Sequence, residues 1–271
     1  MASRKRKATT TSSTNISPSN KMWSSSSSAS AGRRKKSAAA STVSGGGSAG
    51  RSRGAGKSGW DESRANEMFD AIVEEDSPDT ADMEGISKLC TLLSLDPYED
   101  IRVLVLLWKL GATKKPSEIQ RDEFITGSCN MNFDSVEKLR ELIPSLDTGF
   151  LDMEEFRDFY KFCFQFNRTG THKTLDKDLV VALLKMTLSV DSPPRISPTR
   201  LSTFCEFLET NTDESYSKIT LDQWRSFLDF SLEYKDDDGG FEGYDEGESA
   251  WPVLIDEYVE FMEKRNGTKK K

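Results

Sequence analysis

Few residues of this chain could form a catalytic or metal-binding cluster. Its one histidine, His172, lies in a polar segment, with no serine or cysteine at a recognisable triad spacing from it. The four cysteines form no C-x-x-C pair, and four scattered cysteines with one histidine do not match a structural zinc site. No local signature supports a catalytic-cysteine transferase. We therefore expect no catalytic residue, no cofactor and no metal.

One short motif imitates a phosphate-binding loop. Gly56-Lys57-Ser58 matches the end of the pattern G-x-x-x-x-G-K-[ST], in which backbone N–H groups hold phosphates. The pattern needs a glycine where this chain has Arg51, and no apolar strand precedes the motif. We therefore reject a nucleotide-binding P-loop.

Two acidic segments imitate the calcium loop of an EF-hand, which needs side-chain oxygens at positions 1, 3 and 5 and glycine at position 6. In a loop that starts at Asp147, positions 3 and 5 are Gly149 and Leu151, which offer no side-chain oxygen. In a loop that starts at Asp236, position 6 is Phe241. Neither segment is expected to bind calcium tightly.

The strongest candidate for a binding surface is acidic. Residues 206–263 hold 18 acidic residues against three basic ones, a local net charge of −15. Asp222 stands two residues before Trp224, and Asp256 stands two residues after Leu254. In helices that turn these apolar residues inward, both carboxylates point outward. A solvated acidic face is the plain alternative, whereas a docking surface would speed and orient the approach of a basic protein.

Charge divides the chain into two parts. Residues 1–58 contain twelve Lys or Arg and no acid, a charge of +12, and the remainder carries 25 basic and 45 acidic residues, or −20, which together give −8. The first part is rich in Ser, Ala and Gly and cannot bury enough apolar surface to offset its ordering entropy. We expect disorder in residues 1–58 and 267–271, on either side of a domain at 59–266.

The basic part contains two short clusters of the kind that act as nuclear-import signals. They are Arg4, Lys5, Arg6 and Lys7, and Arg33, Arg34, Lys35 and Lys36. A solubilising tail and a loose nucleic-acid contact are the alternatives. Because a body with a charge of −20 repels phosphate, we expect no nucleic-acid partner. The clusters predict a protein of the nucleus and also of the cytoplasm.

Nothing in the sequence indicates a membrane protein or a secreted one. No run of about 18 apolar residues exists, and the N-terminus lacks an apolar signal-peptide core. Ala2 stands where myristoylation requires glycine. The cysteines are expected to be reduced and mostly buried, as in an intracellular protein. They are Cys90, Cys129, Cys163 and Cys205.

From Trp60 onward the apolar residues recur at helical spacing, and strand-like alternation is nearly absent. We predict an all-α body of about ten helices, in two packed halves that divide near residue 170. Four of the predicted helix starts are the capping patterns Ser117-x-x-Gln120, Asp134-x-x-Glu137 and Thr220-x-x-Gln223, and the pair Ser197-Pro198.

The last helix is predicted to begin near Pro252, because proline lacks the N–H that is unpaired in a first turn. The apolar residues that follow it recur at helical spacing and should face the core. They are Leu254, Tyr258, Phe261 and Met262.

Residues 250–261, with the sequence AWPVLIDEYVEF, are similar to the C-terminal signature of the defective-in-cullin-neddylation family, whose shared region is the potentiating-neddylation (PONY) domain. Further motifs of that family occur in order, and the resemblance covers about residues 61–264. They are Leu95-Asp96-Pro97, Val103 to Trp108-Lys109, Asp134-Ser135-Val136-Glu137-Lys138-Leu139, Phe156-Arg157-Asp158-Phe159-Tyr160 and Asp222-Gln223-Trp224.

The resemblance implies two EF-hand-like helical halves without calcium sites, and a scaffold-type ligase role without a reacting residue. Such proteins hold a conjugating enzyme, charged with the ubiquitin-like cullin modifier, beside the acceptor lysine in the cullin C-terminal region. The family's Asp-Ala-Asp cullin-binding patch falls here on Asp222, Ala250 and Asp256.

The resemblance also implies an apolar pocket for the acetylated N-terminal methionine of the conjugating enzyme. Its expected lining residues are Ile86, Val103, Leu106, Leu107, Ile119, Phe166, Leu183 and Met186. For each of them a role in the core is an equally good interpretation. Leu107 and Ile119 differ from the common pocket residues, and residues 235–249 form a longer, more acidic loop than is usual. The ubiquitin-binding module of some family members has no counterpart in the basic tail.

Two other functions stay open on the residues alone. An EF-hand-type calcium-binding regulatory protein would bind calcium in the micromolar range in a calorimetric titration. A helical nucleic-acid-binding protein would bind through residues 1–58 alone, with a steep salt dependence.

Overall fold

The computed structural model describes residues 59–189, 193–235, 241, 243–245, 247 and 250–269. The predicted import signals at 4–7 and 33–36 lie outside these residues, with the rest of the basic tail. The Gly56-Lys57-Ser58 motif also lies outside them, as does Asp236, the start of one rejected calcium loop.

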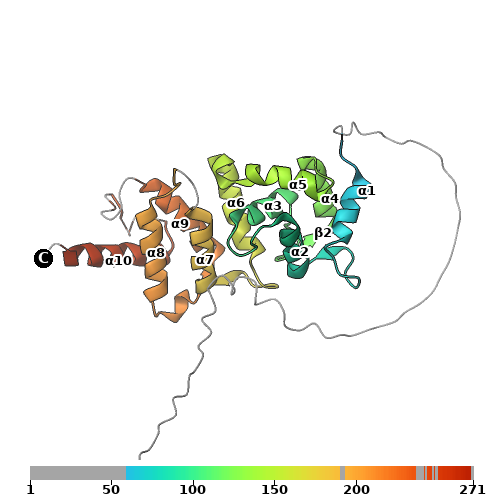
Figure 1. Cartoon of the computed structure of the whole chain (residues 1–271). Coiled ribbons are helices and arrows are strands. Elements are labelled where there is room, and N and C mark those ends of the chain that lie inside the picture. Colours follow the sequence, from blue (N-terminus) through green and yellow to red (C-terminus); the bar gives the residue numbers. More distant parts are fainter. Residues whose placement is uncertain are drawn as a thin grey trace, which may run out of the picture.

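Helices dominate the described part of the chain, as their periodicity predicted (Figure 1). The first half also contains two short strands, which pair antiparallel with Ala81 opposite Ile119. Its elements are α1 Glu62–Asp70, β1 Thr80–Ala81, α2 Met83–Leu93, α3 Ile101–Leu110, β2 Ile119–Gln120, α4 Arg121–Met131, α5 Val136–Leu142, the 3-10 helices η2 Ile143–Leu146 and η3 Thr148–Phe150, and α6 Met153–Phe166.

The second half has a similar order of helices and strands. Its two strands also pair antiparallel, with Leu175 opposite Ile219. In both halves each strand stands before a helix, so each small sheet ties together the loops that lead into two helices. The elements are β3 Thr174–Asp176, α7 Lys177–Leu188, α8 Pro198–Thr210, the 3-10 helix η4 Glu214–Tyr216, β4 Lys218–Thr220, α9 Leu221–Glu233 and α10 Val253–Lys269.

The ten α-helices of the described residues agree with the predicted number, but the four short strands were not predicted. Each strand has two or three residues, which is too short to show an alternation of apolar and polar side chains. No helix in the described ranges combines the length and the hydropathy that crossing a membrane requires.

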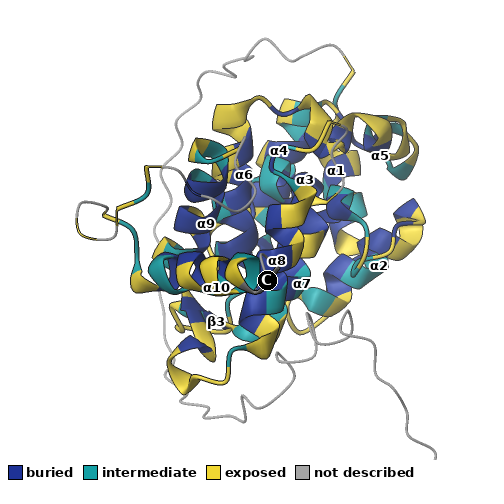
Figure 2. Ribbon diagram, turned by 90° about the vertical axis from the view of Figure 1, so that its left-hand side faces the viewer, coloured by how far each residue is buried: buried dark blue, intermediate teal, exposed yellow. Residues whose placement is uncertain are grey.

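A single hydrophobic core runs through both halves, and α6 lies in the middle of it. This helix contacts α3 on one side and α7 and α9 on the other (Figure 1). Phe159 of α6 packs edge-on against Trp108 of α3 at 5.8 Å, and Tyr160 stacks on Trp224 of α9 at 4.2 Å. Figure 2 shows the buried residues on the inward faces of the surrounding helices. The two halves therefore share one central helix.

Two of the predicted helix starts are confirmed. Thr220 and Gln223 form a reciprocal capping box before α9. Ser197 caps α8 by accepting the N–H of Arg200, and Pro198 is the first residue of that helix. In both places the local sequence supplies every group that the cap needs.

Two predicted starts were wrong. Ser117 adopts the left-handed backbone conformation, with φ of 59°, and α4 begins only after Gln120, which forms a capping box with Glu123. Asp134 is buried and bonds to the segment before α1, so Ser135 is the cap of α5. In each case a tertiary contact or a better carboxylate partner one turn later decided the boundary.

The last helix begins one residue after Pro252, and its predicted core residues face inward. Leu254, Tyr258 and Met262 are buried, and Phe261 is half-buried. The helix continues to Lys269, into the segment 267–271 that was expected to be disordered. Once a helix has formed, each further residue adds one backbone hydrogen bond, which favours this extension.

Candidate functional site

The candidate reactive side chains of the sequence are one histidine and four cysteines. His172 is exposed in a turn, and all four cysteines are free, with three of them buried. Burial raises the pKa of Cys90 and of Cys205 to about 12, so both thiols stay protonated at neutral pH. Asp147, the start of the other rejected calcium loop, caps η3 by accepting the N–H of Gly149 at 2.8 Å. Within the described ranges, no group of three or more His, Cys, Asp or Glu side chains is arranged to hold a metal ion.

Asp222 lies exposed in the first turn of α9, directly after the Thr220 cap. Two residues on, Trp224 is buried, and its indole N–H donates to the backbone carbonyl of Tyr160 at 2.9 Å. The Tyr160 hydroxyl in turn donates to the backbone carbonyl of Trp224 at 3.1 Å. This reciprocal pair fixes the rotation of α9 about its own axis. Asp222 therefore points to solvent, as predicted.

The other two residues of the predicted cullin patch lie at the start of α10. Ala250 is exposed just before the helix, and Asp256 is half-buried in its first turn. Tyr258 anchors the opposite face of this turn, because its hydroxyl lies 2.7 Å from that of Thr203 and its ring packs edge-on against Phe204 at 5.1 Å. The anchor leaves Asp256 at the rim of the domain.

Asp256 has a partner that the sequence did not predict. The Tyr244 hydroxyl donates a hydrogen bond to its Oδ1 atom. Tyr244 packs edge-on against Phe230 at 6.0 Å, and buried Phe241 packs on the same ring at 5.2 Å. The available signal was the pair of aromatic residues, three positions apart, in an otherwise acidic loop. These contacts bring part of that loop to the edge of the predicted patch.

Acidic groups also surround Tyr216 in η4, which precedes β4 and α9. Burial raises the pKa of Tyr216, and the hydrogen bond and charge of Glu257 and the charges of Asp213 and Asp256 raise it further. Negative charge therefore converges here from α10 and from the segment that leads into α9. Because α9 and α10 pack together, the structure places Asp222 and Asp256 on neighbouring helices. No hydrogen bond links these two described side chains directly.

All eight residues of the predicted methionine pocket lie in the core. Their exposed fractions run from 0% for Ile119 and Leu183 to 9% for Met186. The segment before β2 is tied to the end of α6, because the Ser117 N–H donates to the Phe166 carbonyl at 2.8 Å. The pocket residues come from α2, α3, β2, α6 and α7, and are Ile86, Val103, Leu106, Leu107, Ile119, Phe166, Leu183 and Met186. The structure joins them in one core whose apolar surface is covered.

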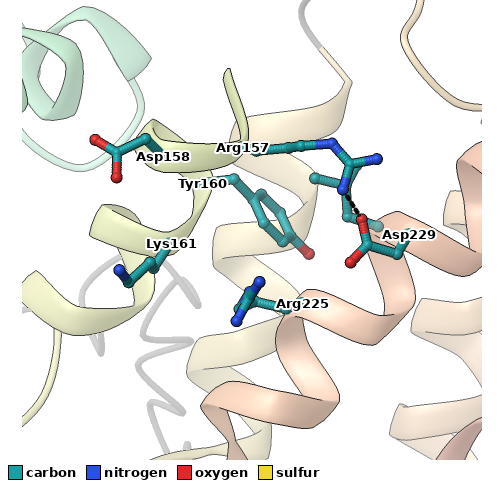
Figure 3. Close-up of a pocket in the computed structure, with 7 residues that line it drawn as sticks. Arg157, Asp158, Tyr160, Lys161, Arg225 and Asp229 are labelled. Atoms are coloured by element: carbon teal, nitrogen blue, oxygen red, sulfur yellow. Dashed lines mark hydrogen bonds and ion pairs between the residues drawn. The ribbon is translucent and has the colours of Figure 1, made fainter. Parts of the chain in front are cut away.

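Two surface cavities are lined by residues that belong to neither predicted site. One has a volume of about 190 Å³, between α6 and α9, and is lined by Arg157, Asp158, Tyr160, Lys161, Arg225, Leu228 and Asp229 (Figure 3). The other has a volume of about 370 Å³ and is lined by Glu62, Asn66, Asp79, Gln120, Arg121, Asp122 and Ile125. Neither cavity includes a residue of the predicted cullin patch or of the methionine pocket.

Comparison with known proteins connects the site to a family. The family described as "Cullin binding" matches residues 138–261, a range that contains the whole predicted cullin patch. DCN1-like protein 5 of Homo sapiens is 32% identical over 182 residues, which cover 67% of this chain and 70% of that protein. DCN1-like protein 3 of Xenopus laevis is 32% identical over 208 residues, which cover 76% of this chain and 62% of that protein. The chain therefore belongs to the cullin-binding family of DCN1-like proteins.

Proposed function

We propose that this protein is a scaffold-type accessory ligase for cullin neddylation, which holds a charged conjugating enzyme beside the acceptor lysine of a cullin. Membership of the family implies a role in cullin neddylation and a cullin as partner. The observation that carries the finer proposal is the position of Asp222, Ala250 and Asp256. They stand at the rim of two adjacent helices, inside the range that matches the cullin-binding family.

The cullin contact depends on charge complementarity. Exposed Asp222 offers its carboxylate directly to a basic side chain of the cullin C-terminal region. At Asp256, Tyr244 bonds to Oδ1 and leaves Oδ2 as the acceptor for a second basic group. Ala250 has no side chain beyond its Cβ, so the cullin backbone can approach α10 closely at this point.

The conjugating enzyme contact depends on apolar burial. Its acetylated N-terminal methionine inserts among the eight pocket residues in the helix-in-groove mode. Because all eight are covered, their side chains must move apart for the methionine to enter. Met186 is the least buried of them, and its unbranched side chain adapts most readily, which favours entry on its side.

The proposed mechanism is catalysis by proximity, and no residue of this chain reacts. Holding both partners on one domain raises their effective concentration and restricts the angle of attack. Orientation of this kind can remove several kcal/mol, on the order of 7–11 in the most favourable cases, from the barrier of a transfer reaction. The protonated Cys90 and Cys205 thiols are consistent with a non-catalytic role.

We further infer that residues 59–266 form a PONY domain of two EF-hand-like halves that bind no calcium. The repeated arrangement of antiparallel strand pairs before helices supports this assignment. The boundary between the halves lies near residue 170, after α6 and before β3. A calorimetric titration with calcium should release no heat in the micromolar range, and a clear binding isotherm would instead favour a calcium-regulated protein.

The two basic clusters at 4–7 and 33–36 support a proposal of nuclear import, with a further population in the cytoplasm. Replacing the basic residues of both clusters with alanine in a fluorescent fusion should move the protein towards the cytoplasm. An unchanged distribution would contradict the assignment of these clusters.

The direct test is a reconstituted assay of cullin modification with the full chain. Adding the protein should raise the rate at which the modifier is transferred to the cullin lysine. The double variant Asp222→Ala with Asp256→Arg should lose that acceleration while keeping its circular dichroism spectrum. A matched variant, Glu67→Ala with Glu75→Arg, makes the same change in charge on exposed positions of the first half. It should keep the full rate.

The outcomes separate the parts of the proposal. If the folded wild-type protein does not accelerate transfer onto any cullin, the scaffold function is wrong. If it accelerates transfer and the double variant does so equally well, the function stands and the patch assignment is wrong.

A further inference from the structure

The groove between α6 and α9 differs in charge from the surface around it. Its cavity of about 190 Å³ is lined by three cations and two carboxylates, on a body whose net charge is −20. Since a water molecule occupies about 30 Å³ of liquid, the cavity has room for a carboxylate and part of its stem. Figure 3 shows the lining side chains of the two helices around this space.

Both carboxylates of the groove already have partners. Asp229 forms an ion pair with Arg157, which neutralises both charges. Asp158 accepts the indole N–H of Trp108 at 2.9 Å and points away from the other lining groups (Figure 3). Neither carboxylate is therefore aimed at the two remaining cations.

Those cations, Lys161 and Arg225, belong to the two helices that line the groove. Exposed Arg225 reaches from α9 towards α6, whereas the nitrogen of half-buried Lys161 is on the side of α6 that faces away from Arg225 (Figure 3). Within the part of the chain that the structure describes, neither forms an ion pair. Two uncompensated cations on facing helices, in a strongly acidic domain, are suited to an anion from outside the chain.

Buried contacts beneath the groove hold its two helices together. Tyr160 and Trp224 stack at 4.2 Å and exchange hydrogen bonds across the same pair of helices, and both are buried. The spacing between the two cation-bearing helices is therefore set before any ligand arrives. Such preorganisation lowers the entropic cost of binding.

The groove adjoins the predicted cullin patch. Arg225 follows Asp222 by three residues, so the two side chains are neighbours on the surface of α9. One helix face thus presents a carboxylate to one side and a guanidinium to the other. A partner seated on Asp222 with a basic group also brings its neighbouring residues over Arg225 and Lys161.

We infer that this groove is a second contact surface for the cullin, which receives a carboxylate-bearing segment adjacent to the basic residues that meet Asp222 and Asp256. The inference rests on the proposed function. Arg225 offers a planar fork that can bind a carboxylate through two hydrogen bonds, and Lys161 adds a point charge from the other side. The cullin surface must then carry acidic and basic residues side by side.

The first experiment measures the affinity of the full chain for a cullin C-terminal fragment. The variant Lys161→Glu with Arg225→Glu should raise Kd about tenfold at low salt, and by less at high salt, because the contact is electrostatic. The charge-matched control Lys173→Glu with Lys235→Glu changes two exposed lysines without ion pairs elsewhere in the described chain. It should change Kd less than twofold.

The second experiment tests the groove without any cullin. Titration with a hexaglutamate peptide should shift the NMR signals of Lys161 and Arg225 first, whereas hexalysine should not shift them. Thermal melting of each variant by circular dichroism checks that the substitutions, which lie at the surface, leave the domain folded.

The two experiments separate the inference from the proposed function. If the Lys161 and Arg225 variant bound the cullin fragment with wild-type affinity while Asp256→Arg lost binding, the groove would not be a cullin contact. The assignment of the patch would still stand. If the wild-type protein bound no cullin fragment, the proposed function would fail, and hexaglutamate would still decide whether the groove takes carboxylates. An absence of shifts at both cations would overturn the groove in either case.

Discussion

The two proposed docking sites of this domain differ in how they are presented. The patch of Asp222, Ala250 and Asp256 is at the surface, and the helices beneath it are fixed by buried aromatic residues. The methionine pocket, by contrast, is closed, with no lining residue more than 9% exposed. Burying a carboxylate is unfavourable, whereas apolar side chains without a ligand are stabilised when they pack against one another. The charged site is therefore exposed before its partner binds, whereas the apolar site is closed.

This difference has consequences for binding. Under the proposed function, a cullin can bind the patch with little rearrangement, at a rate that electrostatic attraction increases. Under the proposed function, the conjugating enzyme must separate packed side chains before its methionine enters, which lowers its apparent affinity by the fraction of open domains. Changes at the patch should therefore alter binding alone, whereas changes in the pocket should alter binding and stability together.

The largest expected effect comes from a residue that supports both sites. Trp224→Ala removes a buried stacked ring and a hydrogen bond to Tyr160. It should lower the free energy of unfolding by about 3–5 kcal/mol, measured by urea denaturation. Trp108→Ala, at a half-buried position, should cost less than half as much and serves as the control. Equal losses in the two variants would show that the contact between α6 and α9 contributes no more to stability than the contact between α3 and α6.

The next largest effect separates the sites. Asp256→Arg should weaken binding of the cullin fragment by about 3 kcal/mol, roughly a hundredfold, because it places a cation against the cullin's basic group. Affinity for an acetylated N-terminal peptide of the conjugating enzyme should stay unchanged. Glu67→Arg is the matched control and should affect neither. Fluorescence anisotropy measures both affinities, and a loss of peptide binding would show that the sites are coupled.

Met186→Ala tests the closed site. It should lower the free energy of unfolding by about 2 kcal/mol. It should also weaken binding of the acetylated peptide several-fold and leave the affinity for the cullin fragment unchanged. Leu188→Ala is a buried truncation on the same helix, outside the predicted pocket. It should lose similar stability and keep peptide affinity. If both variants lost peptide binding equally, the effect would come from stability and not from the pocket.

The smallest effect concerns the unforeseen partner of Asp256. Tyr244→Phe keeps the ring on Phe230 but removes the donor to Oδ1. If this bond orients the carboxylate, cullin binding should weaken by about 0.5–1 kcal/mol, or two- to fivefold, in isothermal calorimetry. Tyr234→Phe removes a hydroxyl from another ring on Phe230 and should have no effect. Tighter binding in the Tyr244 variant would mean that the tyrosine competes with the cullin.

Much of the fold could be predicted from local sequence. Helical periodicity identified the helices, and Thr220 with Gln223 and Ser197 with Pro198 marked two starts correctly, because those caps are made within one turn. Ser117 was misjudged because its N–H bonds to Phe166, 49 positions away. The short strands were missed because their partners lie in another loop.

The site divides in the same way. The outward direction of Asp222 followed from its place two residues before a buried tryptophan, and the structure confirms it. The half-buried state of Asp256 did not follow, since its bond to Tyr244 depends on how the preceding loop folds over Phe230. Helix geometry predicts which way a side chain points. It does not predict which distant group will meet it.

The hydrogen bonds that Tyr160 and Trp224 exchange join two helices that, under the proposed function, contact different partners. Helix α9 bears Asp222, and α6 ends at Phe166, a residue of the predicted methionine pocket. Under the proposed function, the angle between α6 and α9, and not a flexible linker, sets the distance between the thioester of the conjugating enzyme and the acceptor lysine of the cullin. A fixed angle between these helices favours the cullins whose acceptor lysine lies at the matching distance. The choice of cullin would then depend on geometry as well as on affinity.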